Sequence, residues 1–294
     1  MQDIYKPLTE RTPDTQYRDN LKRILDGGIL AKETPQGNGA WTCFGTLPQM
    51  IFDPCNGVPM ITERKIGYKM PIAEILAFIN GARTIDEIKA WGCPFWDDYV
   101  GHGTGIGLEP NDMGPGSYGP AFAAFERPEG GVVNQFEQLI DQIKNFPNMR
   151  THLVTPWKPY YTARGPNRKV IVAPCHGWVH VRILQGKLHM IMNQRSADMP
   201  IGVPHNMIQY AALHLMLCQV TGYEPGLFIH KLDDAHIYES QVPWAKEIIG
   251  RVPRPLPILR IDPDVKDLFT FRPEHFTIDE YDPHPAMKGI PYFP

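Results

Sequence analysis

The sequence predicts an α+β fold, in which a mixed β-sheet has helices packed on it. Helical and strand-like segments both occur along the chain, but they do not alternate as regular βαβ units. The 294 residues include 43% hydrophobic residues, enough for one sizeable core. The 30 prolines and 26 glycines are spread along the chain, and we find no internal repeat or low-complexity tract. We therefore treat residues 1–294 as a single domain.

Four segments are predicted to be helical. Residues 15–27 are amphipathic and end at a glycine pair, and residues 133–146 follow the helical period. Residues 70–80 are apolar, with a proline in the first turn. Residues 204–220 form the most apolar helix of the chain. Residues 101–117 are rich in glycine and are predicted to form a loop.

Strands are predicted from alternating, β-branched or aromatic residues. Residues 39–52 are consistent with one strand, and residues 150–155 look extended. Residues 170–194 are predicted to form two strands around a Gln-Gly turn. Residues 227–238 are strand-like, and residues 253–261 lead into another strand.

Charge and cysteine content exclude several classes of protein. The net charge is −3 and no long basic block occurs, so we expect no DNA binding, although a few arginines could still bind a small anion. No apolar run of 18 residues and no signal-peptide pattern occur, so we expect a cytoplasmic protein with no membrane partner. The five cysteines lack CxxC pairing, which argues against disulfides and a metal site.

Cys175 and the pair Arg195-Ser196 are candidates for covalent chemistry on a phosphorylated ligand. Cys175 lies in a polar Pro-Cys-His-Gly segment at the start of an extended stretch. A thiolate nucleophile needs nearby positive charge, which Arg195 supplies if the two predicted strands pair. An arginine with a hydroxyl suits a phosphate. The alternatives are a core cysteine and a surface salt bridge.

Three further positions have a functional and a structural interpretation. Asn206 opens the most apolar helix, where its amide either reads the edge of uracil or caps the helix. Glu74 lies within an apolar helix and is either a buried proton-transfer group or a carboxylate at the helix edge. His236 and Tyr238 share one side of a strand and either hold a sugar hydroxyl or pair across the sheet.

Taken in order, these segments resemble the thymidylate synthase family, folate-dependent enzymes that add one carbon to C5 of a pyrimidine nucleotide. The resemblance extends from about residue 21 to residue 288 and implies that family's fold, a homodimer formed across the sheet, and 5,10-methylenetetrahydrofolate as co-substrate. The motifs that carry it are Ala-Pro-Cys175-His, Gln-Arg195-Ser-x-Asp198-Met, Gly202-Val-Pro-x-Asn206, Asp234-Ala-His236-Ile-Tyr238, Pro253-Arg-Pro-Leu-Pro and Tyr281-Asp-Pro-His-Pro.

The resemblance assigns residues to the pyrimidine nucleotide monophosphate. It implies that Cys175 attacks C6 of the base and that Asn206, also a catalytic residue, reads the uracil edge. Arg150 would cross to the phosphate site of the partner subunit. The other nucleotide-binding residues that it implies are Arg195 and Ser196 at the 5′-phosphate, Gln194 beside them, and His236 and Tyr238 at the ribose 3′-hydroxyl.

The resemblance also assigns proton transfer and folate binding. Glu74 and Tyr118 would transfer protons. The implied folate-site residues are Trp96, Tyr99, Asp198 and Gly202. In the implied reaction, thiolate addition at C6 makes C5 nucleophilic, and elimination of tetrahydrofolate leaves an exocyclic methylene. Hydride transfer then gives a methyl group, whereas water addition gives a hydroxymethyl group.

Several positions depart from the family pattern, mostly around the phosphate and the folate. Residues 35–37 replace the early Arg-Thr-Gly, and Thr151 replaces a second arginine. Tyr99 stands where the family has a second tryptophan. The chain ends in Pro-Tyr-Phe-Pro instead of a small aliphatic tail, and residues 101–112 look inserted. Altered closure over the folate favours water capture.

The leading hypothesis is therefore dUMP hydroxymethylase, because Asn206 favours uracil over cytosine. The alternatives are an ordinary thymidylate synthase, a dCMP or CMP hydroxymethylase, and an inactive homologue that binds nucleotide or RNA. Hydroxymethylases of this kind occur in bacteriophages that modify their DNA bases and in nucleoside-antibiotic pathways. If the chain is phage-encoded, the expected location is the host cytoplasm.

Overall fold

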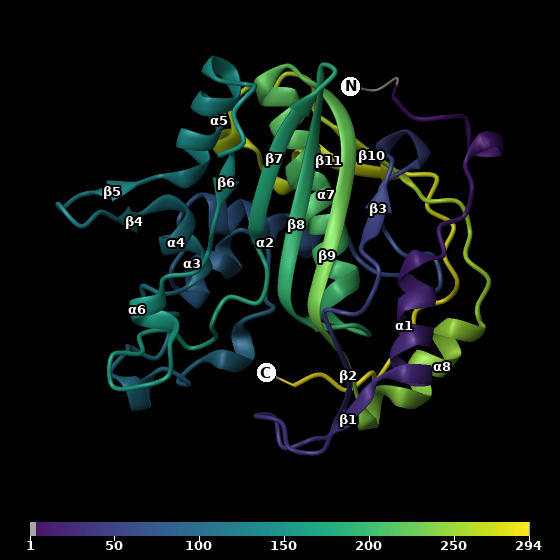
Figure 1. Cartoon of the computed structure of the whole chain (residues 1–294), viewed down its shortest axis with the longest axis horizontal. Coiled ribbons are helices and arrows are strands. Elements are labelled where there is room, and N and C mark those ends of the chain that lie inside the picture. The colour runs from purple at the N-terminus through teal and green to yellow at the C-terminus, as the bar shows by residue number, and fades with distance from the viewer. Residues whose placement is uncertain (1–3, 294) are drawn as a thin grey trace.

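A computed structural model describes residues 4–293, and a seven-stranded mixed sheet lies at its centre (Figure 1). The strand order is β1-β2-β9-β8-β7-β6, and β3 also pairs with β9. The strands are β1 (Ile29–Ala31), β2 (Ala40–Phe44), β3 (Met50–Phe52), β6 (Leu153–Val154), β7 (Trp178–Leu184), β8 (Lys187–Asp198) and β9 (Glu224–Tyr238).

The two longest strands, β8 and β9, pair in parallel, whereas the other neighbours in the sheet are antiparallel. Antiparallel β7 and β8 form a hairpin whose turn residues Gln185 and Gly186 both have positive φ (52° and 75°). A two-residue turn of this kind matches the twist of the strands. The parallel pairing of β8 with β9 sets Asp198 opposite His236.

Helix α7 (Gly202–Thr221) connects β8 to β9 and covers one face of the sheet (Figure 1). Most of its residues are buried, because α2 (Lys69–Ile79) packs on its other side. A helix that is apolar all round needs such a two-sided burial. Helix α7 ends where Gly222 adopts the left-handed conformation that favours glycine.

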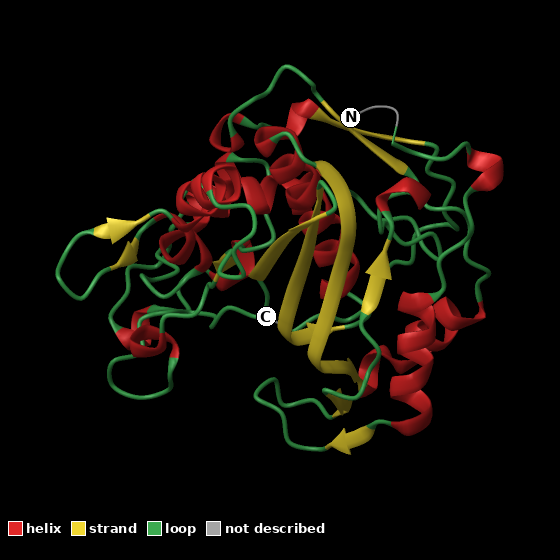
Figure 2. Ribbon diagram, turned by 45° about the horizontal axis from the view of Figure 1, so that its top comes forward, coloured by secondary structure: helices red, strands yellow, loops and turns green. Residues whose placement is uncertain are grey.

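The remaining elements surround this core (Figure 2). Two small antiparallel sheets, β4–β5 and β10–β11, lie apart from the main sheet. These elements are α1 (Gln16–Gly27), α3 (Ile85–Ala90), α4 (Tyr118–Ala123), α5 (Gln135–Asn145), α6 (Pro159–Thr162), α8 (Val242–Gly250), β4 (Phe125–Glu126), β5 (Val132–Val133), β10 (Ile258–Ile261) and β11 (Phe276–Asp279).

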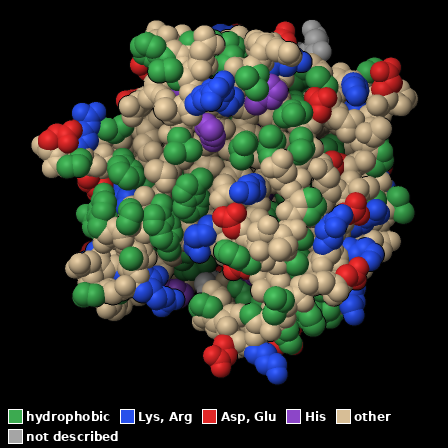
Figure 3. Space-filling model, viewed as in Figure 1, with side chains coloured by type: hydrophobic (Ala, Val, Ile, Leu, Met, Phe, Trp, Pro, Cys, Tyr) green, Lys and Arg blue, Asp and Glu red, His purple; other side chains and the backbone are tan. Residues whose placement is uncertain are grey.

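The other face of the sheet carries no helix in the view of Figure 1. Along β7 the buried residues alternate with half-buried Trp178, His180 and Arg182. Leu153 and Leu184 are 57% and 49% exposed. Figure 3 shows hydrophobic side chains on this side of the molecule, interspersed with lysine, arginine and histidine. The bare face is therefore mixed in character rather than purely polar.

The predicted α+β class with a mixed sheet is confirmed, but some boundaries were wrong. The segment 39–52 forms two strands instead of one, because the chain turns at Gly45 (φ 66°) and each piece pairs with a different part of β9. Val133 belongs to β5, and the amide of Asn134 caps α5. Residues 171–177 form a loop, so β7 begins only after Cys175. Of the segment 150–155, only Leu153–Val154 is strand.

Within residues 4–293, no helix is long and apolar enough to cross a membrane.

Candidate active site

Cys175 lies in the loop before β7, beside the end of β8. The backbone N–H of Ser196 donates to the Cys175 carbonyl at 3.2 Å, and Nη2 of Arg195 lies 3.6 Å from the Cys175 sulfur. Arg195 is itself held by the carbonyls of Pro174 (3.1 Å) and Ala173 (3.3 Å). The predicted pairing of the two segments therefore does bring the guanidinium to the thiol.

Two opposing effects act on the pKa of Cys175. Burial raises it, while the charge of Arg195 and a hydrogen bond from Ser196 lower it. The thiol is therefore not a preformed thiolate in an electropositive pocket. Its ionisation depends on the nearby guanidinium, as a nucleophilic cysteine requires.

Tyr118, the first residue of α4, lies next to the Cys175 backbone. Its phenol oxygen accepts a hydrogen bond of 2.7 Å from the Cys175 N–H, and its ring stacks on His176 at 4.6 Å between centroids. Burial, chiefly, raises the pKa of Tyr118, so the phenol is protonated at neutral pH. His176 is 2.8 Å from the Tyr210 hydroxyl, and burial lowers its pKa to about 3. The residue that follows the nucleophile in the chain is therefore a neutral imidazole.

Glu74 is buried at 7% exposure and is not at the edge of α2. Its carboxylate accepts from Trp96 Nε1 at 2.8 Å and from Gln209 Nε2 at 2.9 Å. Burial raises the pKa of Glu74 to about 7, although these two hydrogen bonds favour the ionised form. A carboxyl group with this pKa can take up or release a proton near neutral pH.

Asn206 does not cap α7, because the helix begins one turn earlier, at Gly202. The Asn206 amide is buried at 7% exposure and bonds to two other amides. Gln194 Nε2 donates to its Oδ1, and its Nδ2 donates to Gln209 Oε1, both at 3.0 Å. Gln194 is buried on β8, where alternate residues face opposite sides, so it turns away from Arg195 and toward Asn206.

His236 and Tyr238 lie at the end of β9, with ring centroids 5.1 Å apart. Asp198 lies opposite His236 in the sheet and accepts from Gln241 Nε2 at 3.1 and 3.2 Å. Burial raises the pKa of Asp198, and the charge of His236 and the Gln241 bond oppose this. These four side chains form a polar cluster where β8 and β9 end.

The C-terminal tail returns to this cluster (Figure 1). Gln241 Nε2 also donates to the Pro291 carbonyl at 2.8 Å, and Phe293 packs on Tyr238 with centroids 4.6 Å apart. The Tyr292 hydroxyl donates to Asp98, in the segment that also carries the predicted folate residues. The tail therefore spans two sides of the candidate site.

Trp96 and Tyr99 form an aromatic pair with ring centroids 5.1 Å apart. Trp96 also contacts the ring of Tyr118 edge-on. Burial raises the pKa of Tyr99 to about 12, and the charges of Cys175 and Glu74 add to this effect. Tyr99 therefore lies on the same side of the site as the nucleophile and the buried carboxyl group.

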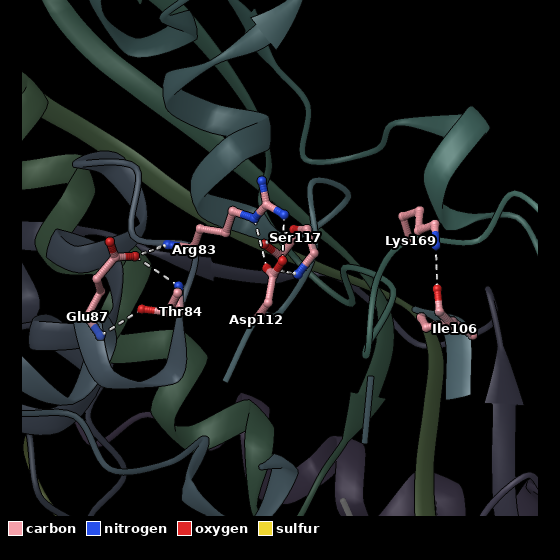
Figure 4. Close-up of polar contacts among 8 residues, drawn as sticks. Arg83, Thr84, Glu87, Ile106, Asp112, Ser117 and Lys169 are labelled. Atoms are coloured by element: carbon pink, nitrogen blue, oxygen red, sulfur yellow. Dashed lines mark hydrogen bonds and ion pairs between the residues drawn. The ribbon is translucent and has the colours of Figure 1, made fainter. Parts of the chain in front are cut away.

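Residues 101–112, predicted to be an insertion, fold back beside α3 (Figure 4). Arg83 Nε donates to Asp112 at 2.8 Å, and Thr84 and Glu87 form a capping box at the start of α3. Lys169 Nζ donates to the Ile106 carbonyl. The segment is thus tied both to α3 and to the chain that leads into the Cys175 loop.

Arg150 is exposed and lies away from Cys175 in the chain's own fold. Its carbonyl is 3.2 Å from His180 Nε2, and Arg182 Nη1 donates to the neighbouring Met149 carbonyl at 2.8 Å. These contacts fasten the Arg150 loop to the bare face of the sheet. Arg150 therefore lies outside the cluster that one copy of the chain assembles.

Sequence reasoning missed Gln209, Gln241 and His176. Gln209 carried a usable signal, since it is a further polar residue in the most apolar helix, three positions after Asn206. Gln241 had none, because it follows β9 in an ordinary Glu-Ser-Gln stretch. Among residues 4–293, no group of three or more His, Cys, Asp or Glu is arranged to hold a metal ion.

The thiol beside a guanidinium, the buried carboxyl group and the paired amide are groups that suit covalent catalysis by a cysteine nucleophile. The thymidylate synthase family model matches residues 15–291. The chain belongs to the thymidylate synthase family, and it is a one-carbon transferase of the folate-dependent kind that acts at C5 of a pyrimidine nucleotide. Members of this family use 5,10-methylenetetrahydrofolate as co-substrate and are generally dimeric.

Proposed function

We propose that the chain transfers a one-carbon unit from 5,10-methylenetetrahydrofolate to C5 of dUMP and releases 5-hydroxymethyl-dUMP. The Cys175 thiolate adds to C6, and C5 then attacks the methylene carbon of the folate. Loss of the C5 proton and elimination of tetrahydrofolate leave an exocyclic methylene on the thioether adduct. Water adds to that methylene, and the Cys175–C6 bond breaks to regenerate the thiolate.

The geometry around Cys175 supports the nucleotide half of this proposal. Arg195 is held beside the sulfur with Ser196 next to it, where we propose that both bind the phosphate. The paired amide of Asn206 is proposed to read the base, and the rings of His236 and Tyr238 the ribose. Glu74, whose pKa is about 7, is proposed to exchange a proton with the base, with Tyr118 as the second proton-transfer group.

The observation that favours hydroxymethylation is the Tyr99 phenol packed against Trp96. We propose that Trp96, Tyr99, Asp198 and Gly202 contribute to the folate site. Because its pKa is about 12, the phenol stays protonated and can hold a water by a hydrogen bond. An apolar ring at this position would exclude that water from the exocyclic methylene.

The tail supports a second candidate, an ordinary thymidylate synthase. Phe293 covers Tyr238, and Gln241 ties Pro291 to Asp198, so aromatic residues lie over the end of the sheet. A tail that excludes water would leave hydride transfer from the folate as the only fate of the methylene. The two candidates therefore differ in what reacts first with the exocyclic methylene. It is water held by Tyr99 in the first candidate and hydride from the folate in the second.

The test is to incubate the protein with dUMP and 5,10-methylenetetrahydrofolate and to identify both products by mass spectrometry. We expect tetrahydrofolate and 5-hydroxymethyl-dUMP. Tyr99→Phe removes only the hydroxyl and should lower the hydroxymethyl fraction roughly fivefold, the effect of one hydrogen bond. Tyr160→Phe, at an exposed tyrosine on α6, is the matched control. Dihydrofolate with dTMP from the unaltered enzyme would establish the second candidate instead.

We also propose that the chain forms a homodimer through the bare sheet face. Leu153 and Leu184 are about half exposed there, and Arg150 lies at its edge. A second copy on this face would bury those side chains. It would also carry Arg150 toward the partner's phosphate site.

A further inference from the structure

A continuous chain of buried hydrogen bonds joins Glu74 to Asn206 through Gln209. The Gln209 amide reaches Glu74 directly at 2.9 Å and Asn206 directly at 3.0 Å, without an intervening water. Gln209 has no measurable exposure. We call this hydrogen-bonded series the amide chain; its members in order are Trp96, Glu74, Gln209, Asn206, Gln194 and His230.

When Glu74 is ionised, the direction of every bond in the amide chain is fixed at the Glu74 end. The Trp96 indole can only donate, and the ionised carboxylate of Glu74 can only accept. Gln209 must therefore turn its NH₂ group toward Glu74 and its oxygen toward Asn206. Asn206 in turn must present its own NH₂ group to Gln209.

The direction is fixed independently at the other end. The Ser196 carbonyl can only accept, and it takes a bond of 3.0 Å from Gln194 Nε2. The same NH₂ group donates to Asn206 Oδ1, so the Gln194 oxygen faces His230 Nε2 at 2.8 Å. His230 is neutral, because burial lowers its pKa to about 3, and it must carry its proton on Nε2. Its other nitrogen, Nδ1, is buried without a partner among the described residues, consistent with this tautomer.

Asn206 is thus held from both sides in one orientation. Reversing its amide would set NH₂ against NH₂ at Gln194 and oxygen against oxygen at Gln209. What Asn206 retains for a ligand is one N–H on its nitrogen and one lone pair on its oxygen. These two groups would pair with a ring that accepts at its C4 substituent and donates at N3, as a 4-oxo pyrimidine does. A 4-amino pyrimidine has the opposite pattern.

We infer that Gln209 is a positioning residue that sets base specificity, because it ties the orientation of the Asn206 amide to the ionised Glu74. This inference rests on the proposed function, in which Asn206 reads the base. Because the Gln209 side chain is fully buried, we assign it no direct contact with the nucleotide or the folate. It acts by adding one of the two buried polar pairs that the wrong orientation of Asn206 would leave mismatched, the other being the pair with Gln194.

The test compares the binding of dUMP and dCMP to the full-length protein by titration calorimetry, without folate, so that no turnover occurs. We expect the unaltered protein to prefer dUMP. Gln209→Leu should lower the ratio of dUMP to dCMP affinity roughly tenfold, because one of the two constraints on Asn206 is gone. Gln209→Met, which matches the length of glutamine more closely, serves as the second variant if the leucine variant is poorly folded.

Gln219→Leu is the matched control. Gln219 lies on the same helix about 15 Å away along the axis and also makes two hydrogen bonds, to the carbonyls of Asp262 and Val265. Its replacement should leave the affinity ratio unchanged. If Gln209→Leu weakens both nucleotides equally, or leaves the ratio as it was, Gln209 is merely structural and the inference is overturned.

A second variant tests the tie to Glu74. In Glu74→Gln, an NH₂ group faces Gln209, which must reverse and then conflicts with the direction fixed at Ser196. Binding of dUMP should weaken more than binding of dCMP, and the double variant with Gln209→Leu should add little to either change. Additive effects would contradict the coupling. If the unaltered protein binds neither nucleotide, the proposed function is overturned as well. If the protein turns over dUMP but Gln209→Leu keeps the ratio of dUMP to dCMP affinity, only this inference is overturned.

Discussion

The sulfur of Cys175 lies 3.6 Å from Nη2 of Arg195, and the same guanidinium is bound to the carbonyls of the two residues that precede Cys175. One arginine therefore both shapes the nucleophile loop and supplies the charge that favours the thiolate. Because burial acts in the opposite direction on the pKa of Cys175, the arginine decides how much thiolate exists near neutral pH.

Replacing Arg195 with glutamine should raise the pKa of Cys175 by about 1 or more, because an opposite charge at this distance stabilises the ionised form. The measurement is the rate of alkylation of Cys175 by iodoacetamide as a function of pH, with the modified residue identified by mass spectrometry. Arg168→Gln is the control, since Arg168 binds the carbonyls of Val170 and Ile171 in the same loop. Equal alkylation profiles in all three proteins would contradict the assignment.

Glu74 should make the protein less stable as pH rises from about 5 to 8. Its pKa is raised from 4.5 to about 7 in the folded state, so folding binds a proton in that window and stability is lost as the proton leaves. The loss is at most roughly 3 kcal/mol, at about 1.4 kcal/mol per pH unit. Urea unfolding of Glu74→Gln should show a flatter pH dependence than the unaltered protein.

The control for that measurement is Glu129→Gln, at an exposed loop position. It should follow the unaltered protein at every pH. A Glu74→Gln variant that keeps the full slope would show that other groups cause the pH dependence.

Gln241→Leu should release the C-terminal tail and weaken folate binding. The variant loses the bonds from one amide to both Asp198 oxygens and to the Pro291 carbonyl, and it leaves a half-buried carboxylate without those donors. We expect the KM for the folate to rise about tenfold or more and the KM for dUMP to change little. Steady-state kinetics with each substrate varied in turn measures both constants.

A chain that ends after Ile290 should reproduce the effect of Gln241→Leu on the folate KM, since both changes remove the same link. If the truncated chain keeps the folate KM of the unaltered enzyme, the tail contributes nothing to folate binding. The contacts of Phe293 and Tyr292 would then be structural only.

Mixing two inactive variants should restore activity if Arg150 serves the partner's site. Arg150→Ala lacks the arginine but keeps Cys175, whereas Cys175→Ala keeps the arginine but lacks the nucleophile. After the subunits are unfolded and refolded together, a mixed dimer has one complete site, so up to about a quarter of the unaltered activity should return. The control is a mixture of Arg182→Ala with Arg150→Ala. Because Arg182 holds the loop that carries Arg150, both changes damage the same loop, and this mixture should regain much less activity.

The local sequence determined which residue types were available for chemistry. Cys175, Arg195 and Asn206 each stand in a short contiguous motif, and the periodicity of residues 15–27, 70–80 and 204–220 identified the long helices correctly. These features depend on neighbours within a few positions, which a single chain displays directly. The parallel pairing of β8 with β9 and the split of residues 39–52 depend on contacts far along the chain, so periodicity could not predict them.

Only the tertiary structure decided how those groups are held. Glu74 and Gln209 lie 135 positions apart, yet their direct bond, with Trp96 on the other side, fixes which way the Asn206 amide faces. The direction of an amide is set by the donors and acceptors at both ends of a buried chain, and no sequence pattern encodes it. The same holds for Gln241, which becomes important only because the sheet sets Asp198 beside it and the tail returns to the same place. Sequence specified the reactive groups, and long-range packing specified their orientation.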